Sequence, residues 1–476
     1  MSLWTAQDAV AATGGKTTCD WQANGVSIDT RSIQPGDLFV ALTDIRDGHD
    51  FVAQALDKGA AAALVSRRPD GVAADAPLLI VPDVLKGLEA LGIAARARTN
   101  AHIAAITGSV GKTSTKEMLR IVLKKQGNCH AAEASYNNHW GVPLTLARMP
   151  ADTDYAIIEI GMSNPGEIAP LSRMARPHVA MVTTVAAAHL AAFDNLAGIA
   201  TEKAAIMDGL EPGGIAVLNS DIETSAILQK YAAQTGATPI LFGTTAADWA
   251  ITDVRLSGDV TVISASGDGQ DYLFKLAVPG RHFASNAVGV LAVVNALGGD
   301  PVAAALDIVE WVPPAGRGTR EVIMIDPFNE NEKLDLIDDA FNANPTSLAA
   351  SLEVIAASTP IDNVGQIIKG RRIAILGDML ELGPDAVQMH RDMAENPHLQ
   401  SLDLIHCAGP LMHHLWQALP ERQRGQWAEQ ASDLSPQISR LVDAGDAVLV
   451  KGSKGSKVSL VVDAIRKLGH PRPREN

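Results

Sequence analysis

Residues 108–113 read G-S-V-G-K-T, two glycines followed by a lysine and a threonine. In loops that bind nucleotide phosphates, backbone N–H groups and the lysine contact the phosphates, and the threonine hydroxyl binds magnesium. The usual pattern begins with a glycine at the position that Ile106 occupies here, so this loop is a shortened one. The alternative is a turn that binds no ligand. We predict that the loop binds a nucleotide through Gly108, Ser109, Val110, Gly111, Lys112, Thr113 and Ser114.

Three later residues are candidates for metal or phosphate chemistry. Glu159 ends the apolar run YAIIE, where an unpaired carboxylate is costly to bury, so we predict a magnesium ligand rather than an ion pair. His189 follows the run MVTTVAAA, where a histidine is either a metal ligand or an ordinary hydrogen-bonded residue. Lys203 lies in a helical apolar pattern, and this local pattern favours a surface lysine whose stem covers apolar neighbours.

Weaker candidates occur at turns and strand ends further along the chain. Asn286 in GRHFASNA stands where a helix opens, so capping of that helix is the common explanation. Arg317 lies on a Pro/Gly-rich linker, where it is either a phosphate ligand or an exposed charge. The stretch DDAFNANP forms a strand-to-helix turn, and turn chemistry competes with ligand binding there. Its candidate residues are Asp339, Asn342 and Asn344, while Asp378 and Lys451 follow two later strands.

The elements that must position these residues follow an α/β pattern. HIAAIT, at 102–107, predicts a buried parallel strand, and the apolar spacing after Lys112 predicts a helix that ends at Gly127. A strand, a glycine turn and a helix in this order direct backbone N–H groups and the positive helix end toward an anion. The context of the loop therefore supports phosphate binding.

The chain of 476 residues is long enough for about three domains. Residues 1–97 predict a small N-terminal α/β domain. Residues 98–314 predict a central P-loop-type domain with a mostly parallel sheet, in which 260–280 alternates like antiparallel strands. Residues 315–476 predict a Rossmann-like domain, because strands ending in Gly, Asp or Lys lead into helices.

Composition narrows the classes of function. The net charge of −15 disfavours a nucleic-acid or anionic membrane partner. The cysteines are few, odd in number and widely spaced, so a reducing compartment fits better than a disulfide framework. We find neither a signal peptide nor an apolar run long enough to cross a bilayer. We expect a cytoplasmic protein without membrane insertion.

The order of these features along the chain resembles the Mur ligase family. The stretches DTRSIQPGDLFVAL with DGHDFV, SYNNHWGVPLTL, DDAFNANPTSLAASL and LGDMLELGPDAVQMHRDM are similar to one branch of it. The resemblance covers nearly the whole chain. It implies an ATP-dependent ligase that acts in peptidoglycan precursor synthesis, and we expect a monomer. Such an enzyme joins D-alanyl-D-alanine to UDP-N-acetylmuramoyl-tripeptide through an acyl phosphate.

The resemblance also implies roles for individual residues. Lys112, Glu159, His189 and Lys203 would be catalytic. Two magnesium ions would be held by Thr113, Glu159, His189 and a carbamylated Lys203. For ATP, Asn286 would meet adenine, and Arg317 and Asp339 would reach the phosphates and ribose. The UDP nucleotide would be held by Asp29, Thr30, Arg31, Asp47, Gly48 and His49, its sugar-peptide part by Asn137 and Asn138, and the dipeptide by Asn342, Asn344 and Ser347.

Three positions depart from the family pattern. Phe283 replaces the usual Asn after the histidine of GRHF, Ala204 and Ala205 replace Gly-Glu after Lys203, and the turn TDIR lacks a common glycine. Two alternatives remain open. One is a sister ligase that adds a single amino acid, which would be expected to lack NANP and GDMLELG. The other is a regulatory module whose ATP site only switches conformation.

Overall fold

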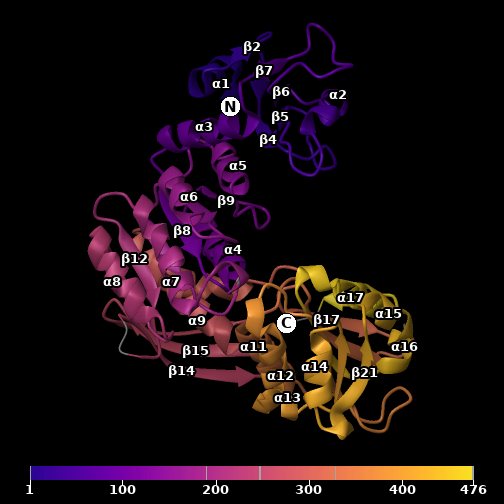
Figure 1. Ribbon diagram of the computed structural model, residues 1–476. Helices are drawn as coiled ribbons and strands as arrows, with labels where there is room; N and C mark the ends of the chain where they lie inside the picture. The colour runs from indigo at the N-terminus through magenta and orange to yellow at the C-terminus, as the bar shows by residue number, and fades with distance from the viewer. Residues whose placement is uncertain (1, 189, 246–247, 327, 474–476) are drawn as a thin grey trace.

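The computed structural model describes residues 2–188, 190–245, 248–326 and 328–473. Within these residues the strands form sheets of five, nine and seven strands and one two-stranded pair. We refer to the stretches that contain the three large sheets as the N-terminal unit (2–97), the central unit (98–314) and the C-terminal unit (315–473). Figure 1 shows the three units following one another in space as they do along the chain, from indigo through magenta to yellow.

The N-terminal unit is built on the five-stranded sheet, whose order is β2-β7-β6-β5-β4. Strands β4 to β7 are parallel, and β2 is antiparallel to β7. The strands are β2 (Lys16–Thr17), β4 (Gly25–Ser27), β5 (Asp37–Val40), β6 (Ala62–Val65) and β7 (Leu78–Ile80), and β1 (Trp4–Thr5) pairs with β3 (Gln22–Ala23). The helices are α1 (Ala6–Thr13), η1 (Gly48–Phe51), α2 (Val52–Asp57) and α3 (Val84–Ala97).

The central unit is built on the nine-stranded sheet, of order β16-β15-β14-β13-β12-β11-β8-β10-β9. Strands β8 to β14 run parallel, whereas β14, β15 and β16 are antiparallel, as the alternation at 260–280 predicts. The strands are β8 (His102–Thr107), β9 (Cys129–Ala131), β10 (Tyr155–Glu159), β11 (Val179–Val182), β12 (Ile215–Asn219), β13 (Thr238–Gly243), β14 (Trp249–Ser257), β15 (Val260–Gly267) and β16 (Gln270–Leu276).

Helices cover both faces of this sheet because alternate residues of its strands are buried in different cores. In β8, Ala104 and Ile106 lie in the core that contains α4 (Lys112–Lys124) and α9 (Arg281–Ala296). Ile103 and Ala105 lie in the opposite core. That core contains α5 (Gly141–Ala147), α6 (Ile168–Ala175), α7 (Leu196–Ala204) and α8 (Ser225–Thr235); the remaining central helices are η2 (Leu190–Ala192), η3 (Ala205–Gly209), α10 (Pro301–Asp307) and η4 (Ile308–Glu310).

The C-terminal unit has the order β21-β20-β19-β22-β18-β17-β23. Its strands from β18 to β21 are parallel, and β17 is antiparallel to both of its neighbours. The strands are β17 (Thr319–Met324), β18 (Lys333–Asp339), β19 (Arg372–Gly377), β20 (Leu404–Ala408), β21 (Arg424–Ala428), β22 (Ala447–Lys451) and β23 (His470–Pro473).

Helices again cover both faces of the C-terminal sheet. One face carries α11 (Pro345–Ala357), α12 (Ala386–Asp392), α13 (Pro397–Gln400) and α14 (Met412–Ala418), and the other carries α15 (Ala431–Leu434), α16 (Ile438–Leu441) and α17 (Ser459–Arg466). The short helices are η5 (Gly383–Asp385), η6 (Met393–Glu395), η7 (Glu421–Gln423), η8 (Ser435–Gln437) and η9 (Lys454–Ser456).

The N-terminal unit shares a hydrophobic core with the central unit. Leu144 and Ala147 of α5 are buried together with Trp4 and Leu38 of the N-terminal unit. The indole N–H of Trp4 also donates a 2.8 Å hydrogen bond to the Ala147 carbonyl. Helix α5 therefore completes the core of the preceding unit.

The predicted α/β class and the mostly parallel central sheet are confirmed. The helix after the glycine loop ends at Lys124, earlier than the Gly127 end that its sequence predicts, because the chain turns at Lys125. The division at 97/98 and 314/315 stays a prediction. No helix in the described ranges combines the length and apolar character needed to cross a bilayer.

Candidate active site

The glycine loop connects β8 to α4 and has a backbone that only glycine adopts easily. Gly108 has φ +154° and Gly111 has φ +89°. A Cβ atom at Gly108 would collide with the Thr183 hydroxyl, and one at Gly111 would lie 2.9 Å from the Asn286 amide. Helix α4 begins at Lys112, and no side chain caps its first turn. Its N-terminal N–H groups and positive end consequently face the loop, an arrangement suited to phosphate.

Lys112 folds back over the loop. Its Nζ donates a 2.5 Å hydrogen bond to the Gly108 carbonyl. Burial lowers the pKa of Lys112, while the charges of Glu159 and Arg317 shift that pKa in opposite directions. The ammonium group is thus held beside the glycine backbone, where it can meet an anionic ligand.

Thr113 and Glu159, predicted as magnesium ligands, lie in contact. The Thr113 hydroxyl donates to both carboxylate oxygens of Glu159, at 3.1 and 3.0 Å. Glu159 ends β10, is 3% exposed and also accepts a 2.8 Å hydrogen bond from Asn137 Nδ2. In the described ranges no lysine or arginine lies within ion-pair distance of Glu159, although its charge acts on both Lys112 and Arg317. A hydroxyl and a buried carboxylate are oxygen ligands of the kind that magnesium prefers.

The described residues contain no group of three or more His, Cys, Asp or Glu side chains placed to hold a metal. Thr113 Oγ1 and the Glu159 carboxylate would hold a magnesium ion, and phosphate oxygens and water would complete its shell. This fits magnesium, which is usually bound through one or two carboxylates together with substrate phosphates.

The loop 132–138, between β9 and α5, forms one side of this site. Ser135 Oγ lies 3.0 Å from Thr113 Oγ1, and Asn138 Oδ1 accepts a 2.9 Å hydrogen bond from the Gly141 N–H. Asn137 thus contacts Glu159, whereas Asn138 holds the start of α5. Ser135 was not among the predicted residues, although it opens the stretch SYNN that carries part of the family resemblance.

Arg317 reaches this loop from the linker between the central and C-terminal units. Its Nη2 donates a 3.0 Å hydrogen bond to Ser135 Oγ, and its guanidinium lies 4.1 Å from the centroid of the Phe341 ring. Burial lowers the pKa of Arg317, and the carboxylates of Glu159 and Asp339 oppose this shift. Arg317 is partly buried between two units, so the alternative of an exposed loop charge is wrong.

The linker is attached to the C-terminal sheet by its backbone. Phe341 N donates to the Gly316 carbonyl at 3.0 Å, and Gly318 N donates to the Asp338 carbonyl at 2.9 Å. These bonds extend the end of β18 onto the linker. Arg317 is therefore carried by the C-terminal unit although it contacts the central one.

A cavity of about 480 Å³ joins these elements. Its lining residues come from the central and C-terminal units. The predicted residues among them are Ser109, Val110, Gly111, Lys112, Thr113, Ser114, Asn137, Asn138, Glu159, Asn286, Arg317, Asp339, Asn342, Asn344, Ser347 and Lys451. The cavity thus brings together residues predicted for ATP, for the sugar-peptide part and for the dipeptide.

Asn286 occupies a different place from the one that helix capping predicts. Helix α9 begins at Arg281 with Gly280 as its N-cap, so Asn286 lies inside the helix. It is buried, and its side chain lies against Gly111. The capping interpretation is wrong because the helix starts five residues earlier, at Arg281. Phe283, on the first turn, is buried against Trp311, with ring centroids 5.0 Å apart.

The C-terminal wall of the cavity is held by hydrogen bonds and an ion pair. Asp339 Oδ2 lies 2.7 Å from Lys451 Nζ and accepts a 2.5 Å hydrogen bond from Ser351 Oγ. Asn344 caps α11: its Oδ1 accepts from Ser347 N at 2.9 Å, and its N–H donates to Ser347 Oγ at 3.0 Å. Helix-cap hydrogen bonds therefore account for the positions of the Asn344 and Ser347 side chains in this structure.

Lys203 is buried, with 2% of its surface exposed. The prediction of a surface lysine is wrong, because the face of α7 that carries Lys203 packs into the central core. Burial and then the charge of Lys112 hold the pKa of Lys203 well below its ordinary value. Lys203 does not line the cavity. His189, the other predicted ligand in this region, lies outside the described residues.

The residues predicted for the UDP nucleotide lie on the N-terminal unit, away from the cavity. Arg31 is exposed and pairs with Asp29 at 2.6 Å, and Thr30 Oγ1 donates to Gln54 at 3.0 Å. Asp47 lies 2.6 Å from His49 Nδ1 and 2.7 Å from Arg67 Nη2. The Arg67 guanidinium, followed by the His49 N–H, lowers the pKa of Asp47.

His49 and Gly48 fix the turn that holds this cluster. Ser66 N donates to His49 Nε2 at 3.0 Å, so the ring is the tautomer that carries its proton on Nδ1, facing Asp47. A Cβ atom at Gly48 would collide with the Leu42 carbonyl. The conformation of the turn 47–49 therefore depends on both residues.

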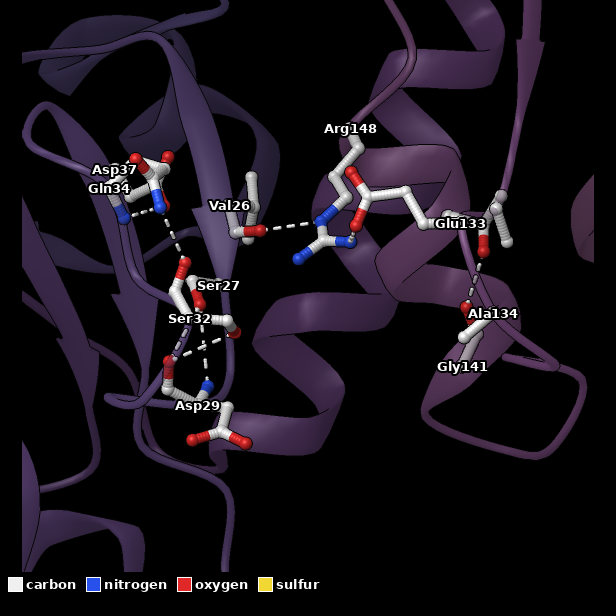
Figure 2. Close-up of polar contacts among 12 residues, drawn as sticks. Val26, Ser27, Asp29, Ser32, Gln34, Asp37, Glu133, Ala134, Gly141 and Arg148 are labelled. Atoms are coloured by element: carbon white, nitrogen blue, oxygen red, sulfur yellow. Dashed lines mark hydrogen bonds and ion pairs between the residues drawn. The ribbon is translucent and has the colours of Figure 1, made fainter. Parts of the chain in front are cut away.

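The junction between the N-terminal and central units is bridged by Arg148, at the end of α5. Figure 2 shows Arg148 reaching toward β4, where its Nε donates a 2.6 Å hydrogen bond to the Val26 carbonyl. Glu133 lies on the other side of the guanidinium, 4.0 Å from Nη1. Arg148 thus connects the strand that leads to Asp29 with the loop 132–138.

Comparison with known proteins agrees with this geometry. Residues 22–118 match the Mur ligase family catalytic domain, residues 106–294 the Mur ligase middle domain, and residues 326–454 the Mur ligase glutamate ligase domain. The UDP-N-acetylmuramoyl-tripeptide–D-alanyl-D-alanine ligase of Rickettsia prowazekii is 30% identical, over 97% of this chain and 99% of the relative. The Escherichia coli protein of that name is 33% identical, over 94% and 95%.

Solved structures have the same fold. The crystal structure of MurF from Acinetobacter baumannii superposes with a TM-score of 0.82 at 27% identity, over 97% of this chain and 99% of that one. MurF ligase from Thermotoga maritima superposes with a TM-score of 0.74 at 24% identity, over 93% and 97%. Sequence similarity over nearly the full length, together with this shared three-sheet fold, shows that the chain belongs to the Mur ligase family.

Proposed function

We propose that the chain is an ATP-dependent ligase that joins D-alanyl-D-alanine to UDP-N-acetylmuramoyl-tripeptide in peptidoglycan precursor synthesis. Relatives that carry this name are similar to nearly the whole chain. The observation that carries the proposal is the single cavity in which the glycine loop and Glu159 face Arg317 and the end of β18. Between residues of two units, such a cavity would hold a nucleotide, a carboxylate and an amine close together.

The reaction has two steps. The terminal carboxylate of the tripeptide attacks the γ-phosphorus of ATP, the bond to the bridging oxygen breaks, and ADP leaves. The amine of the dipeptide, having lost a proton, attacks the acyl carbon of the resulting acyl phosphate. The carbon–oxygen bond breaks and inorganic phosphate leaves. Phosphoryl transfer requires mainly positioning and charge stabilisation, which Lys112 and Arg317 supply from opposite sides of the cavity.

Thr113 and Glu159 would hold a magnesium ion at the nucleotide. Both are buried, they contact each other, and their oxygens suit this cation. Bound there, the ion neutralises charge on the phosphate oxygens. Asn286 would then contact the adenine, and Asp339 the ribose, from the two sides of the cavity.

Lys203 would serve as a carbamate that helps to hold a second magnesium ion together with His189. Carbamylation joins a neutral amine to CO₂ with loss of one proton, so it needs a lysine that is not protonated. Burial among apolar side chains favours this form, because it lowers the pKa of Lys203. Neither a hydrogen bond nor an ion pair joins the Lys203 ammonium to another described residue. Ala204 and Ala205 add no carboxylate that would keep it charged.

The substrates would extend in opposite directions from the cavity. The uridine nucleotide would lie against Asp29, Thr30, Arg31 and the 47–49 turn, and the sugar-peptide part would pass Asn137 and Asn138 toward Glu159. The dipeptide would enter at Asn342, Asn344 and Ser347. We expect the protein to act as a monomer. The free cysteines suit the reducing cytoplasm.

One experiment tests this function. Purified protein is incubated with ATP, magnesium, UDP-tripeptide and D-alanyl-D-alanine, and the products are analysed by mass. We expect the UDP-pentapeptide, with one ADP released for each amide bond. Ligation of a single amino acid in place of the dipeptide would indicate a sister ligase. ATP turnover without either substrate, or no turnover with both, would contradict the proposal.

A further inference from the structure

Lys116 is a lysine in the interior of α4, with none of its side chain exposed. It lies one helical turn after Thr113, and residues spaced in this way project from the same face of a helix. Its neighbours Thr115, Met118 and Leu119 are buried as well. The position is one at which an apolar side chain would be expected.

Every donor of the Lys116 ammonium has a partner. Nζ donates to the Ala132 carbonyl at 2.6 Å and to the Ala134 carbonyl at 3.2 Å, and it lies 2.9 Å from Glu117 Oε1. A buried ammonium is costly unless its three donors are satisfied. Two of these partners are backbone carbonyls of the loop 132–138, so the charge specifies where that loop must lie relative to α4.

The loop that Lys116 holds carries groups of the proposed site. Ser135 contacts both Thr113 and Arg317, and Asn137 contacts Glu159. Asn137 is further fixed by its carbonyl, which accepts a 2.7 Å hydrogen bond from Gly161 N. A shift of the loop away from α4 would separate Ser135 from Thr113 and pull Asn137 from the carboxylate.

We propose that Lys116 is a positioning residue that fixes the loop 132–138 against α4 and thereby sets the affinities for magnesium and for the UDP-linked substrate. This inference rests on the proposed function. Lys116 touches neither ligand. It acts through Ser135, which orients the Thr113 hydroxyl, and through Asn137, which orients Glu159. Groups that orient a metal ligand typically change metal affinity or activity by about 10- to 100-fold when they are removed.

The test compares two substitutions of Lys116 with a control on the same helix. Lys116→Met keeps the length and removes all donors, and Lys116→Gln keeps an amide donor for one carbonyl. Lys124→Met removes an exposed lysine from the last turn of α4. For each protein the half-saturating magnesium concentration and the KM values for UDP-tripeptide and dipeptide are measured. Hydrogen exchange of the 132–138 amides is followed without ligands.

We expect Lys116→Met to raise the half-saturating magnesium concentration and the KM for UDP-tripeptide by about 10- to 100-fold. The KM for the dipeptide should stay near the wild-type value. For Lys116→Gln both constants should lie between those of Lys116→Met and wild type, and for Lys124→Met they should equal those of wild type. Hydrogen exchange of the 132–138 amides should accelerate only in the two Lys116 variants.

Other outcomes would overturn the inference. A folded Lys116 variant with wild-type magnesium and UDP-tripeptide dependence would show that the lysine does not act on the site. Equal changes in all three constants, or two Lys116 variants that do not fold, would assign Lys116 to the fold alone. A wild-type protein without ligase activity would refute the proposed function, whereas unchanged exchange in the loop would refute the positioning role by itself.

Discussion

Replacing Gly108 by alanine tests whether the shortened loop binds nucleotide through its backbone. The new Cβ would collide with the Thr183 hydroxyl, which donates a 2.6 Å hydrogen bond to the Val110 carbonyl. A non-glycine residue at a φ of +154° costs about 1–3 kcal/mol. Displacing Thr183 costs about 1 kcal/mol more through the lost hydrogen bond.

The sum is about 2–4 kcal/mol. If the loop changes its conformation to relieve the collision, restoring the binding conformation costs this energy. The affinity for Mg-ADP should then fall by roughly 30- to 1,000-fold. Titration calorimetry with Mg-ADP measures this change directly. UDP-tripeptide affinity should change little, because its proposed uridine contacts lie on the N-terminal unit.

Two further variants separate strain from collision. Gly236→Ala places alanine at a φ of +75° at the end of α8, with no atom within 4 Å of the new Cβ, so it should lower stability and leave ADP binding intact. Gly108→Ala combined with Thr183→Ala removes the colliding hydroxyl and should recover part of the affinity. ADP binding by Gly108→Ala at the wild-type level would refute the reasoning, and a double variant no better than the single one would show that the collision is not the cause.

Four more outcomes are expected. Lys112→Ala should abolish ligation and leave far-UV circular dichroism unchanged, and activity with normal ATP dependence would contradict the P-loop assignment. Lys203→Ala should lose most activity and regain part with added short-chain carboxylic acids, whereas full unrescued activity would rule out the carbamate. A fragment of residues 1–314 retains every residue of the N-terminal and central hydrophobic cores. It should therefore bind UDP-tripeptide without ligating it. Measurable ligation would argue against dipeptide binding by the C-terminal unit. Burial lowers the pKa of His406 to about 4. Between about pH 6.5 and pH 4, His406 is therefore protonated in the unfolded chain but not in the folded one. Urea unfolding should show a free energy of unfolding about 2 kcal/mol lower at pH 5 than at neutral pH, and His406→Gln should lack this contribution.

Strand-end reasoning located much of the site in advance. Glu159, Asp339 and Lys451 all end parallel strands, and such ends meet ligands at one edge of a sheet. The structure brings all three to the walls of one cavity. The glycine loop was equally accessible from sequence, because its spacing, its strand and its helix are contiguous.

Contacts made by irregular segments could not be found in the same way. Ser135 lies in a loop without periodicity, and its partner Arg317 is 182 positions away. Lys116 and Lys203 interrupt helical patterns as surface lysines do, and only the packing of other elements over α4 and α7 shows that they are buried. Asn286 was misplaced because no local signal shows that its helix begins at Arg281.

The core shared by the N-terminal and central units has a consequence for synthesis on the ribosome. Leu144 and Ala147 complete the packing around Trp4 and Leu38, yet they leave the ribosome long after the last strand of the N-terminal sheet. Until α5 emerges, the nascent chain exposes an apolar face that a chaperone can bind. The N-terminal unit should therefore complete its core during synthesis only when α5 has emerged, before the later strands of the central sheet and the C-terminal unit have been made.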